Sequence, residues 1–126
     1  MNYLAHAYLS FHEPGILAGN LISDFVKGKK KFDYSSGIQK GIALHRAIDN
    51  FTDGHQATRE AKEVFRPAYR LYAGAFVDVV FDHFLATDPT IFTSESLQLF
   101  SAEVYHSIDQ SLPSLPEKFQ SIFPYM

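Results

Sequence analysis

The chain has 126 residues, of which 46% are hydrophobic and 15% aromatic, so it can bury one core and is too apolar to be disordered. Its formal net charge of -3 gives the protein as a whole no attraction for nucleic acid or for an anionic membrane. Because it contains no cysteine, disulfides, thiolate zinc sites and cysteine nucleophiles are excluded, and any metal would be held by His and carboxylate side chains.

Two short helices are predicted near the N-terminus, over residues 2–11 and 16–27, with a Pro-Gly turn between them. The first has apolar residues at helical spacing, and His6 lies beside that face. Taken alone, His6 is more typical of ordinary packing or hydrogen bonding than of a ligand. In the second helix, Asp24 falls on the apolar stripe, which predicts a carboxylate that points inward or into a cleft. N-capping, an ion pair with a lysine and metal ligation are all open for Asp24.

Lysines gather in the segment that follows. Together with the serine-containing stretch after them, they indicate an exposed basic loop that ends at a Ser N-cap. Such a run is either a solvated loop or a docking surface for an acidic partner. The residues are Lys27, Lys29, Lys30 and Lys31.

A third helix is predicted over residues 36–52, and the turn signal Asp53-Gly54 ends it. His45 and Asp49 lie one turn apart on one face of this helix. A pair at this spacing is either a weak charge pair on a helix surface or two ligands of one ion.

The next segments differ in polarity. Residues 56–66 alternate in charge, which is typical of a solvated helix that leads to Pro67. Residues 94–108 form a weaker amphipathic pattern. The last stretch contains three prolines and predicts an exposed apolar tail with little helix, formed by Ile122, Phe123, Tyr125 and Met126.

Residues 68–86 predict a central buried helix, because they are apolar nearly all round the helix. This segment nevertheless carries Asp78, Asp82 and His83. Two carboxylates one turn apart repel each other, so they need either cationic partners, such as Arg46 or Arg70, or a bound cation.

These elements predict a single all-α domain over residues 1–126, a compact bundle of about five to six helices. No apolar run approaches the roughly 18 residues of a membrane span, and the N-terminus lacks the pattern of a signal peptide, so a cytoplasmic location is expected. Burying a carboxylate or an imidazole costs free energy unless it is paired or bound to a metal. The acids and histidines on these apolar faces therefore indicate a shared metal site.

Four segments together resemble the acyl carrier protein phosphodiesterase family. They are Met1-Asn-Tyr-Leu-Ala-His-Ala-Tyr-Leu, Gly19-Asn-Leu-Ile-Ser-Asp-Phe-Val-Lys-Gly28, Gly41-Ile-Ala-Leu-His-Arg-Ala-Ile-Asp-Asn-Phe-Thr-Asp53 with His55, and Asp78-Val-Val-Phe-Asp-His-Phe-Leu85. The resemblance covers residues 1 to about 87. It implies an all-helical, HD-like fold, related to divergent HD-type phosphohydrolases. It also implies that a divalent metal, typically manganese, helps to cleave 4'-phosphopantetheine from the serine of holo acyl carrier protein.

The resemblance also implies roles for particular residues. The metal ligands would come from His6, Asp24, His45, Asp49, Asp78 and Asp82. Asp24 is expected to be the essential acid, and His83 or a metal-bound water could protonate the departing serine. HD proteins usually carry an adjacent His-Asp pair, whereas Asp82-His83 stands in the reverse order here. Lys27 or Arg46 could neutralise phosphoryl charge, and the four lysines of residues 27–31 would meet the acidic carrier protein.

Two alternatives remain open: an HD-like hydrolase of another phosphoester, and a non-catalytic helical module that binds an acidic partner. Family members continue past residue 126, so the resemblance implies that their C-terminal portion is absent here. The apolar tail could then pair with a second copy of the chain.

Overall fold

The computed structural model describes residues 2–126; Met1, the first residue of the N-terminal motif, lies outside the described residues. All regular structure in this part of the chain is helical, which confirms the predicted class. The α-helices are α1 (Tyr3–Tyr8), α2 (Pro14–Ile22), α3 (Ser36–Gly54), α4 (Gln56–Tyr69), α5 (Ala73–Thr87), α6 (Ser94–Ser111) and α7 (Glu117–Ile122). Short 3-10 segments are η1 (Ser23–Phe25), η2 (Gly28–Asp33), η3 (Arg70–Tyr72), η4 (Leu112–Ser114) and η5 (Phe123–Tyr125). Within residues 2–126, no helix has both the length and the apolarity needed to cross a membrane.

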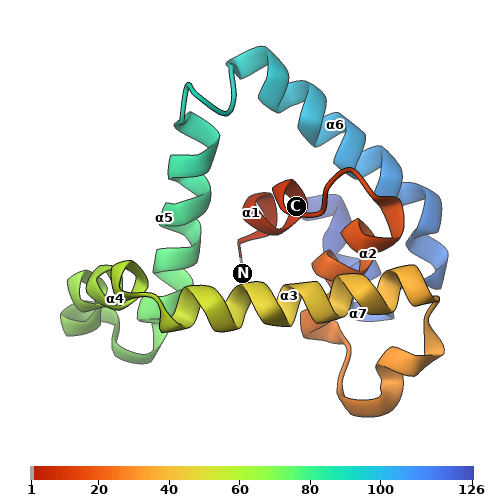
Figure 1. Ribbon diagram of the computed structural model, residues 1–126, viewed down its shortest axis with the longest axis horizontal. Helices are drawn as coiled ribbons and strands as arrows, with labels where there is room; N and C mark the ends of the chain where they lie inside the picture. Colours follow the sequence, from red (N-terminus) through yellow and green to blue (C-terminus); the bar gives the residue numbers. More distant parts are fainter. Residues whose placement is uncertain (1) are drawn as a thin grey trace.

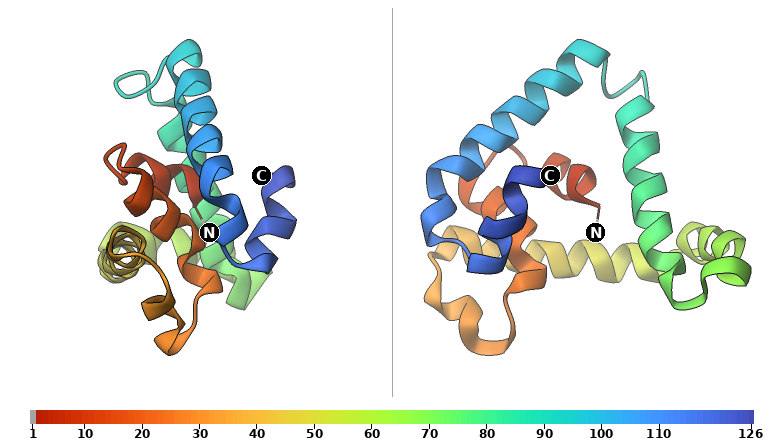
Figure 2. Two further views of the ribbon diagram at one scale, coloured as in Figure 1. Left: turned by 90° about the vertical axis from the view of Figure 1, so that its right-hand side faces the viewer. Right: turned by 180° about the vertical axis from the view of Figure 1, so that it is seen from behind.

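Three long helices, α3, α5 and α6, form a triangular frame, and α1 and α2 lie within it (Figures 1 and 2). The core is at the end of the frame where α2 packs against α3, α6 and α7. Its fully buried side chains include Leu21, Ile22, Ile42, Ile108 and Phe119. The short helices are thus held between longer ones, because six to nine residues do not form a stable helix without such packing.

The closest helix pair is α2 and α3, which cross at two glycines. A Cβ atom on Gly19 would collide with the carbonyl oxygen of Ile38, and one on Gly41 would collide with that of Ile16. The two backbones can approach this closely only because neither position carries a side chain. This crossing places α2 against the first two turns of α3.

Local signals set the boundaries of several helices. Pro14 begins α2 and the Glu13 side chain accepts a hydrogen bond from the Gly15 N–H. The predicted Ser N-cap is Ser35, whose Oγ accepts from the Ile38 N–H at 3.4 Å. The predicted stop at Gly54 is also confirmed, since α3 ends there.

The prediction of one central buried helix over residues 68–86 is wrong in two respects. First, α4 continues through Pro67 to Tyr69, and Arg70 then takes a φ of 47°, which separates α4 from α5. Second, only Ala73 and Val77 are buried on α5. The reason is that α5 packs mainly against α4 and α1, so much of its surface is left in solvent and Val79 is 66% exposed.

The expected exposed tail is also mostly wrong. Residues 117–122 form α7, whose Phe119 is fully buried and packs against the Phe25 and Phe123 rings. Met126 packs against the same core, and among the four residues of the predicted tail only Tyr125 is mostly exposed, at 88%. The basis for pairing through this tail is therefore weaker than predicted, and self-association stays a prediction.

The glycine crossing can be tested with Gly41→Ala, because the added methyl group must push α2 away from α3. We expect the free energy of unfolding to fall by at least about 2 kcal/mol, measured by urea denaturation followed by circular dichroism. Gly54→Ala is the matched control, because open space surrounds a Cβ there and no left-handed φ is involved. It should change stability by less than about 1 kcal/mol. Equal effects would contradict the close crossing.

Candidate metal centre

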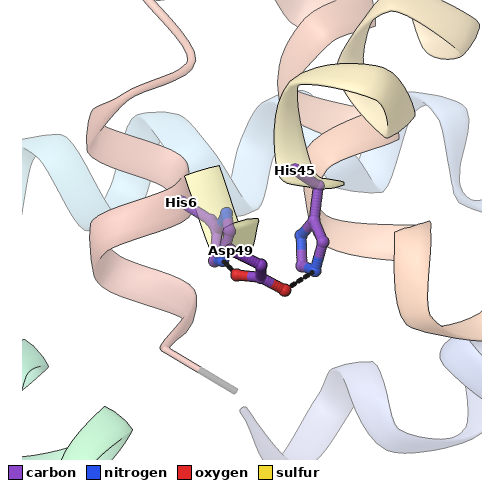
Figure 3. A group of neighbouring side chains, drawn as sticks. All are labelled: His6, His45 and Asp49. Atoms are coloured by element: carbon purple, nitrogen blue, oxygen red, sulfur yellow. Dashed lines mark hydrogen bonds and ion pairs between the residues drawn. The ribbon is translucent and has the colours of Figure 1, made fainter. Parts of the chain in front are cut away.

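Side chains from α1 and α3 meet at one point inside the frame. His6 comes from α1, and His45 and Asp49 come from adjacent turns of α3 (Figure 3). Each of the three offers one ligand atom, and these atoms all lie within 4.8 Å of one another. Both histidines are almost completely buried, whereas the Asp49 carboxylate is partly open to solvent. This is a candidate metal-binding triad with one side accessible.

The distances in the triad suit a shared cation. Oδ1 of Asp49 lies 3.2 Å from Nε2 of His6, and its Oδ2 lies 3.1 Å from Nε2 of His45. Ligand bonds of about 2.0 to 2.2 Å in tetrahedral or octahedral geometry place neighbouring donor atoms about 3.0 to 3.4 Å apart. The imidazole rings stack with their centroids 4.0 Å apart and 13° between their planes, so both Nε2 atoms face the same side.

The Nε2 atom of His45 provides the most direct test of whether these residues suit a metal ion. It is buried and makes no hydrogen bond, although Asp49 and Asp24 oxygens lie 3.1 and 3.3 Å away. The other nitrogen of the ring, Nδ1, lies 2.7 Å from the carbonyl oxygen of Asn20, which can only accept. In the neutral ring Nδ1 therefore carries the proton, which leaves on Nε2 the lone pair that a metal ligand needs.

The charges around the triad are strongly coupled. Burial and the neighbouring His45 lower the pKa of His6 below its ordinary value. Burial also acts to lower the pKa of His45, but interactions with the Asp24 and Asp49 carboxylates outweigh it and leave that pKa raised. The interaction with His45 in turn holds the pKa of Asp24 below its usual range. Near neutral pH the centre thus combines a neutral His6 with an ionised Asp24, a donor set suited to a divalent cation.

A pocket of about 300 Å³ opens directly onto this centre. Asp24, His45 and Asp49 line it together with Lys27 and Arg46. Asp24 thus points into a cleft, as its place on the apolar stripe predicted. A guanidinium nitrogen of Arg46 also lies 3.4 Å from the Val26 carbonyl, which ties it to the same wall.

Asp82 has a different position from the one predicted. Its two carboxylate oxygens accept hydrogen bonds from the backbone N–H groups of Leu4 and Ala5, at 3.0 and 2.9 Å. Asp82 therefore ties α5 to the first turn of α1, the helix that carries His6. Its pKa is raised because burial outweighs these two bonds.

The remaining predicted residues lie outside the triad. Asp78 is on α5 and contributes a charge near Asp82. His83 is exposed on α5, where its ring tilts against Phe84, and it does not line the pocket. The three consecutive lysines, residues 29–31, belong to η2 beside the pocket, and Lys31 lies over the Phe32 ring. The structure thus brings together His6, Asp24, His45 and Asp49, with Lys27 and Arg46 at the rim.

The sequence analysis missed Asn20 and Ser10. Asn20 is fully buried, and Ser10 is buried beside it. Asn20 contacts both imidazoles, through Oδ1 for His6 at 2.7 Å and through its backbone carbonyl for His45. The available signal was a lone asparagine inside an apolar helix, which requires hydrogen-bond partners when buried.

Comparison with known proteins gives one consistent result. A family model described as acyl carrier protein phosphodiesterase matches residues 1–126. An acyl carrier protein phosphodiesterase from Photorhabdus laumondii is 35% identical over 100% of this chain and 64% of its own length. Proteins of the same name from Salmonella dublin and Salmonella paratyphi A are 37% and 36% identical over 100% of this chain and 66% of their own. The chain thus spans just under two thirds of these relatives, and no solved structure matches it.

The geometry of the triad predicts that His45 on α3 contributes to metal affinity and that His83 on α5 does not. We expect His45→Ala to raise the dissociation constant for Mn²⁺ at least about 100-fold, measured by isothermal titration calorimetry, because it removes a ligand rather than an outer partner. His83→Ala should bind Mn²⁺ as the unmodified protein does. Equal losses in the two variants would contradict the placement of His83 outside the centre.

Proposed function

The chain belongs to the acyl carrier protein phosphodiesterase family, and from this membership and the geometry of the centre we propose that it is a metal-dependent phosphodiester hydrolase. Its proposed substrate is holo acyl carrier protein, from which it removes the 4'-phosphopantetheine group to leave the apo form. The proposed cofactor is Mn²⁺. The relatives that match this chain carry the same named activity.

One observation carries the metal-dependent part of the proposal. The buried Nε2 of His45 has a lone pair and no hydrogen bond, and it faces carboxylate oxygens that also can only accept. Such an arrangement of acceptors is unfavourable unless a proton or a metal cation lies among them, and two imidazoles with carboxylates form a donor set that suits a divalent cation. His6, His45 and Asp49 would hold that cation, with Asp24 beside them.

When bound, a divalent cation supplies Lewis acidity that polarises the phosphodiester and lowers the pKa of water. Asp24 is suited to orient the attacking water, because its carboxylate is half exposed in the pocket and stays ionised. As the water oxygen bonds to phosphorus, Asp24 accepts a proton from it. The bond between phosphorus and the serine oxygen breaks, and that oxygen then takes up a proton. Asp24 can return the one it accepted.

Two cationic side chains at the rim of the pocket are suited to balance the charge of the phosphoryl group. Lys27 and Arg46 line the same cavity as Asp24 and Asp49. Their positive charges would balance the negative charge that spreads over the phosphoryl oxygens during displacement. Arg46 is held in place by its contact with the Val26 carbonyl.

The basic segment beside the pocket supports the proposal that the substrate is an acidic protein. Acyl carrier proteins are strongly acidic, whereas this chain has a net charge of -3, so the two repel each other at long range. Lys29, Lys30 and Lys31 follow directly on Lys27 and form a local positive surface at the mouth of the site. This surface is proposed to dock the carrier protein.

The proposal predicts Mn²⁺-dependent loss of phosphopantetheine from holo acyl carrier protein, read as the mass of the product. Asp24→Asn keeps the shape of the side chain and removes the base, so it should lower the rate at least about 100-fold. A folded protein that binds Mn²⁺ but leaves the carrier protein intact would overturn the proposed substrate in favour of another phosphoester. A protein that binds no Mn²⁺ would instead support a non-catalytic module.

The docking surface is tested by reversing its charge. The triple change of Lys29, Lys30 and Lys31 to Glu should raise the KM for holo acyl carrier protein at least about 10-fold, because attraction becomes repulsion. Hydrolysis of a small chromogenic phosphodiester should be unaffected, since these residues lie outside the pocket. The matched control is Lys118→Glu on α7, which changes an exposed lysine elsewhere. If both substrates lose activity equally, the docking role is wrong.

A further inference from the structure

A fully buried polar network lies behind the two imidazoles, on the side away from the pocket. Its central residue is Asn20, in the last turn of α2, and Ser10 connects it to the end of α1. Both side chains have no measurable exposure. Polar groups at such depth must satisfy one another, so the direction of each hydrogen bond can be worked out.

The side-chain amide of Asn20 has only one consistent orientation. The hydroxyl group of Ser10 donates to the carbonyl oxygen of His6 at 2.7 Å. Nδ2 of Asn20 donates to that carbonyl at 3.0 Å and to Oγ of Ser10 at 3.1 Å. Because both neighbours on this side accept, the NH₂ group must face them and Oδ1 must face the His6 ring.

The protonation of His6 follows from this orientation. Oδ1 of Asn20 lies 2.7 Å from Nδ1 of His6 and can only accept, so Nδ1 carries the proton. A neutral imidazole with its proton on Nδ1 has a lone pair on Nε2. That atom is the one that faces Oδ1 of Asp49, at a hydrogen-bonding distance of 3.2 Å. Both contacts of the ring are with acceptors, and the shorter one, at 2.7 Å to Asn20, favours the proton on Nδ1.

The backbone carbonyl of Asn20 places the proton on Nδ1 of the second ring, that of His45. Asn20 lies among the last four residues of α2, whose carbonyl groups have no partner within an α-helix. Nδ1 of His45 donates to the Asn20 carbonyl at 2.7 Å. The crossing at Gly19 and Gly41 brings this carbonyl to α3, since any side chain there would separate the helices.

We propose that Asn20 is a positioning residue that sets the tautomer of both histidines, through its side-chain oxygen for His6 and its backbone carbonyl for His45. Both Nε2 lone pairs then point at Asp49 before any cation arrives. Ser10 acts one step further out, because it orients the amide of Asn20. Because the side chain of Asn20 acts on His6 and its backbone carbonyl acts on His45, a change of this one side chain should affect only His6.

The first experiment uses the unmodified, metal-free protein and therefore does not depend on the proposed function. Nitrogen-15 NMR of the imidazoles at about pH 9, well above the ordinary His pKa of about 6.5, reports which nitrogen carries the proton. We expect the proton on Nδ1 in both His6 and His45. A proton on Nε2 of either ring would overturn the inference.

The second experiment uses Asn20→Leu, which has a similar size and no hydrogen-bonding group. His6 should lose its preference for the Nδ1 proton, whereas His45 should keep it, because the backbone carbonyl remains. The dissociation constant for Mn²⁺ should rise about 10- to 100-fold, the range typical of outer partners of a ligating histidine. Ser10→Ala should give a smaller change in the same direction.

The control is Thr58→Val, which removes a buried hydroxyl from α4, away from the centre. It should leave both tautomers and the Mn²⁺ affinity unchanged, whatever its effect on the unfolding midpoint. Unchanged Mn²⁺ affinity in Asn20→Leu would overturn the inference. So would a loss of the tautomer preference in both rings, because that result reports general loosening of the fold.

Discussion

The centre depends on how closely α2 approaches α3. Gly19 and Gly41 let the two backbones touch, and this contact brings the carbonyl of Asn20 to the ring of His45. The imidazole then satisfies a helix-terminal carbonyl that would otherwise be buried without a partner. One packing constraint thus joins the core and the candidate centre, because His45 and Asp49 stand on the helix whose backbone is held against α2.

The other half of the centre depends on α1, which has only six residues and cannot be stable alone. It is held at both ends by groups from distant parts of the chain. Asp82 of α5 binds the N–H groups of its first turn, and Asn20 binds the carbonyl of His6. Asp82, which the sequence analysis placed among the candidate ligands, thus fixes the helix that carries His6 of the candidate triad.

The exposed apolar side chains on α5 and in the turn before it are the main departure from an ordinary globule. Val79 and Phe84 are each more than half exposed, and Leu71, at the turn before α5, is 98% exposed. Exposing apolar side chains to water is unfavourable. A sequence that is apolar all round a helix therefore predicts a buried helix. Full burial of α5 requires neighbours on every side, whereas residues 2–126 cover it mainly with α4 and α1.

The sequence by itself determined the helical class, the ends of α3, and the pair His45 and Asp49, because these follow from periodicity, caps and spacing within one helix. It also placed Asp24 in a cleft from its position on the stripe. Only the tertiary structure decided which distant residues join that pair: His6 enters, whereas Asp82 and His83 lie elsewhere. The role of Asn20 was also invisible, because its partners are a backbone atom and side chains 10 to 25 residues away. Local patterns report the face of a helix, but the packing of helices decides what that face meets.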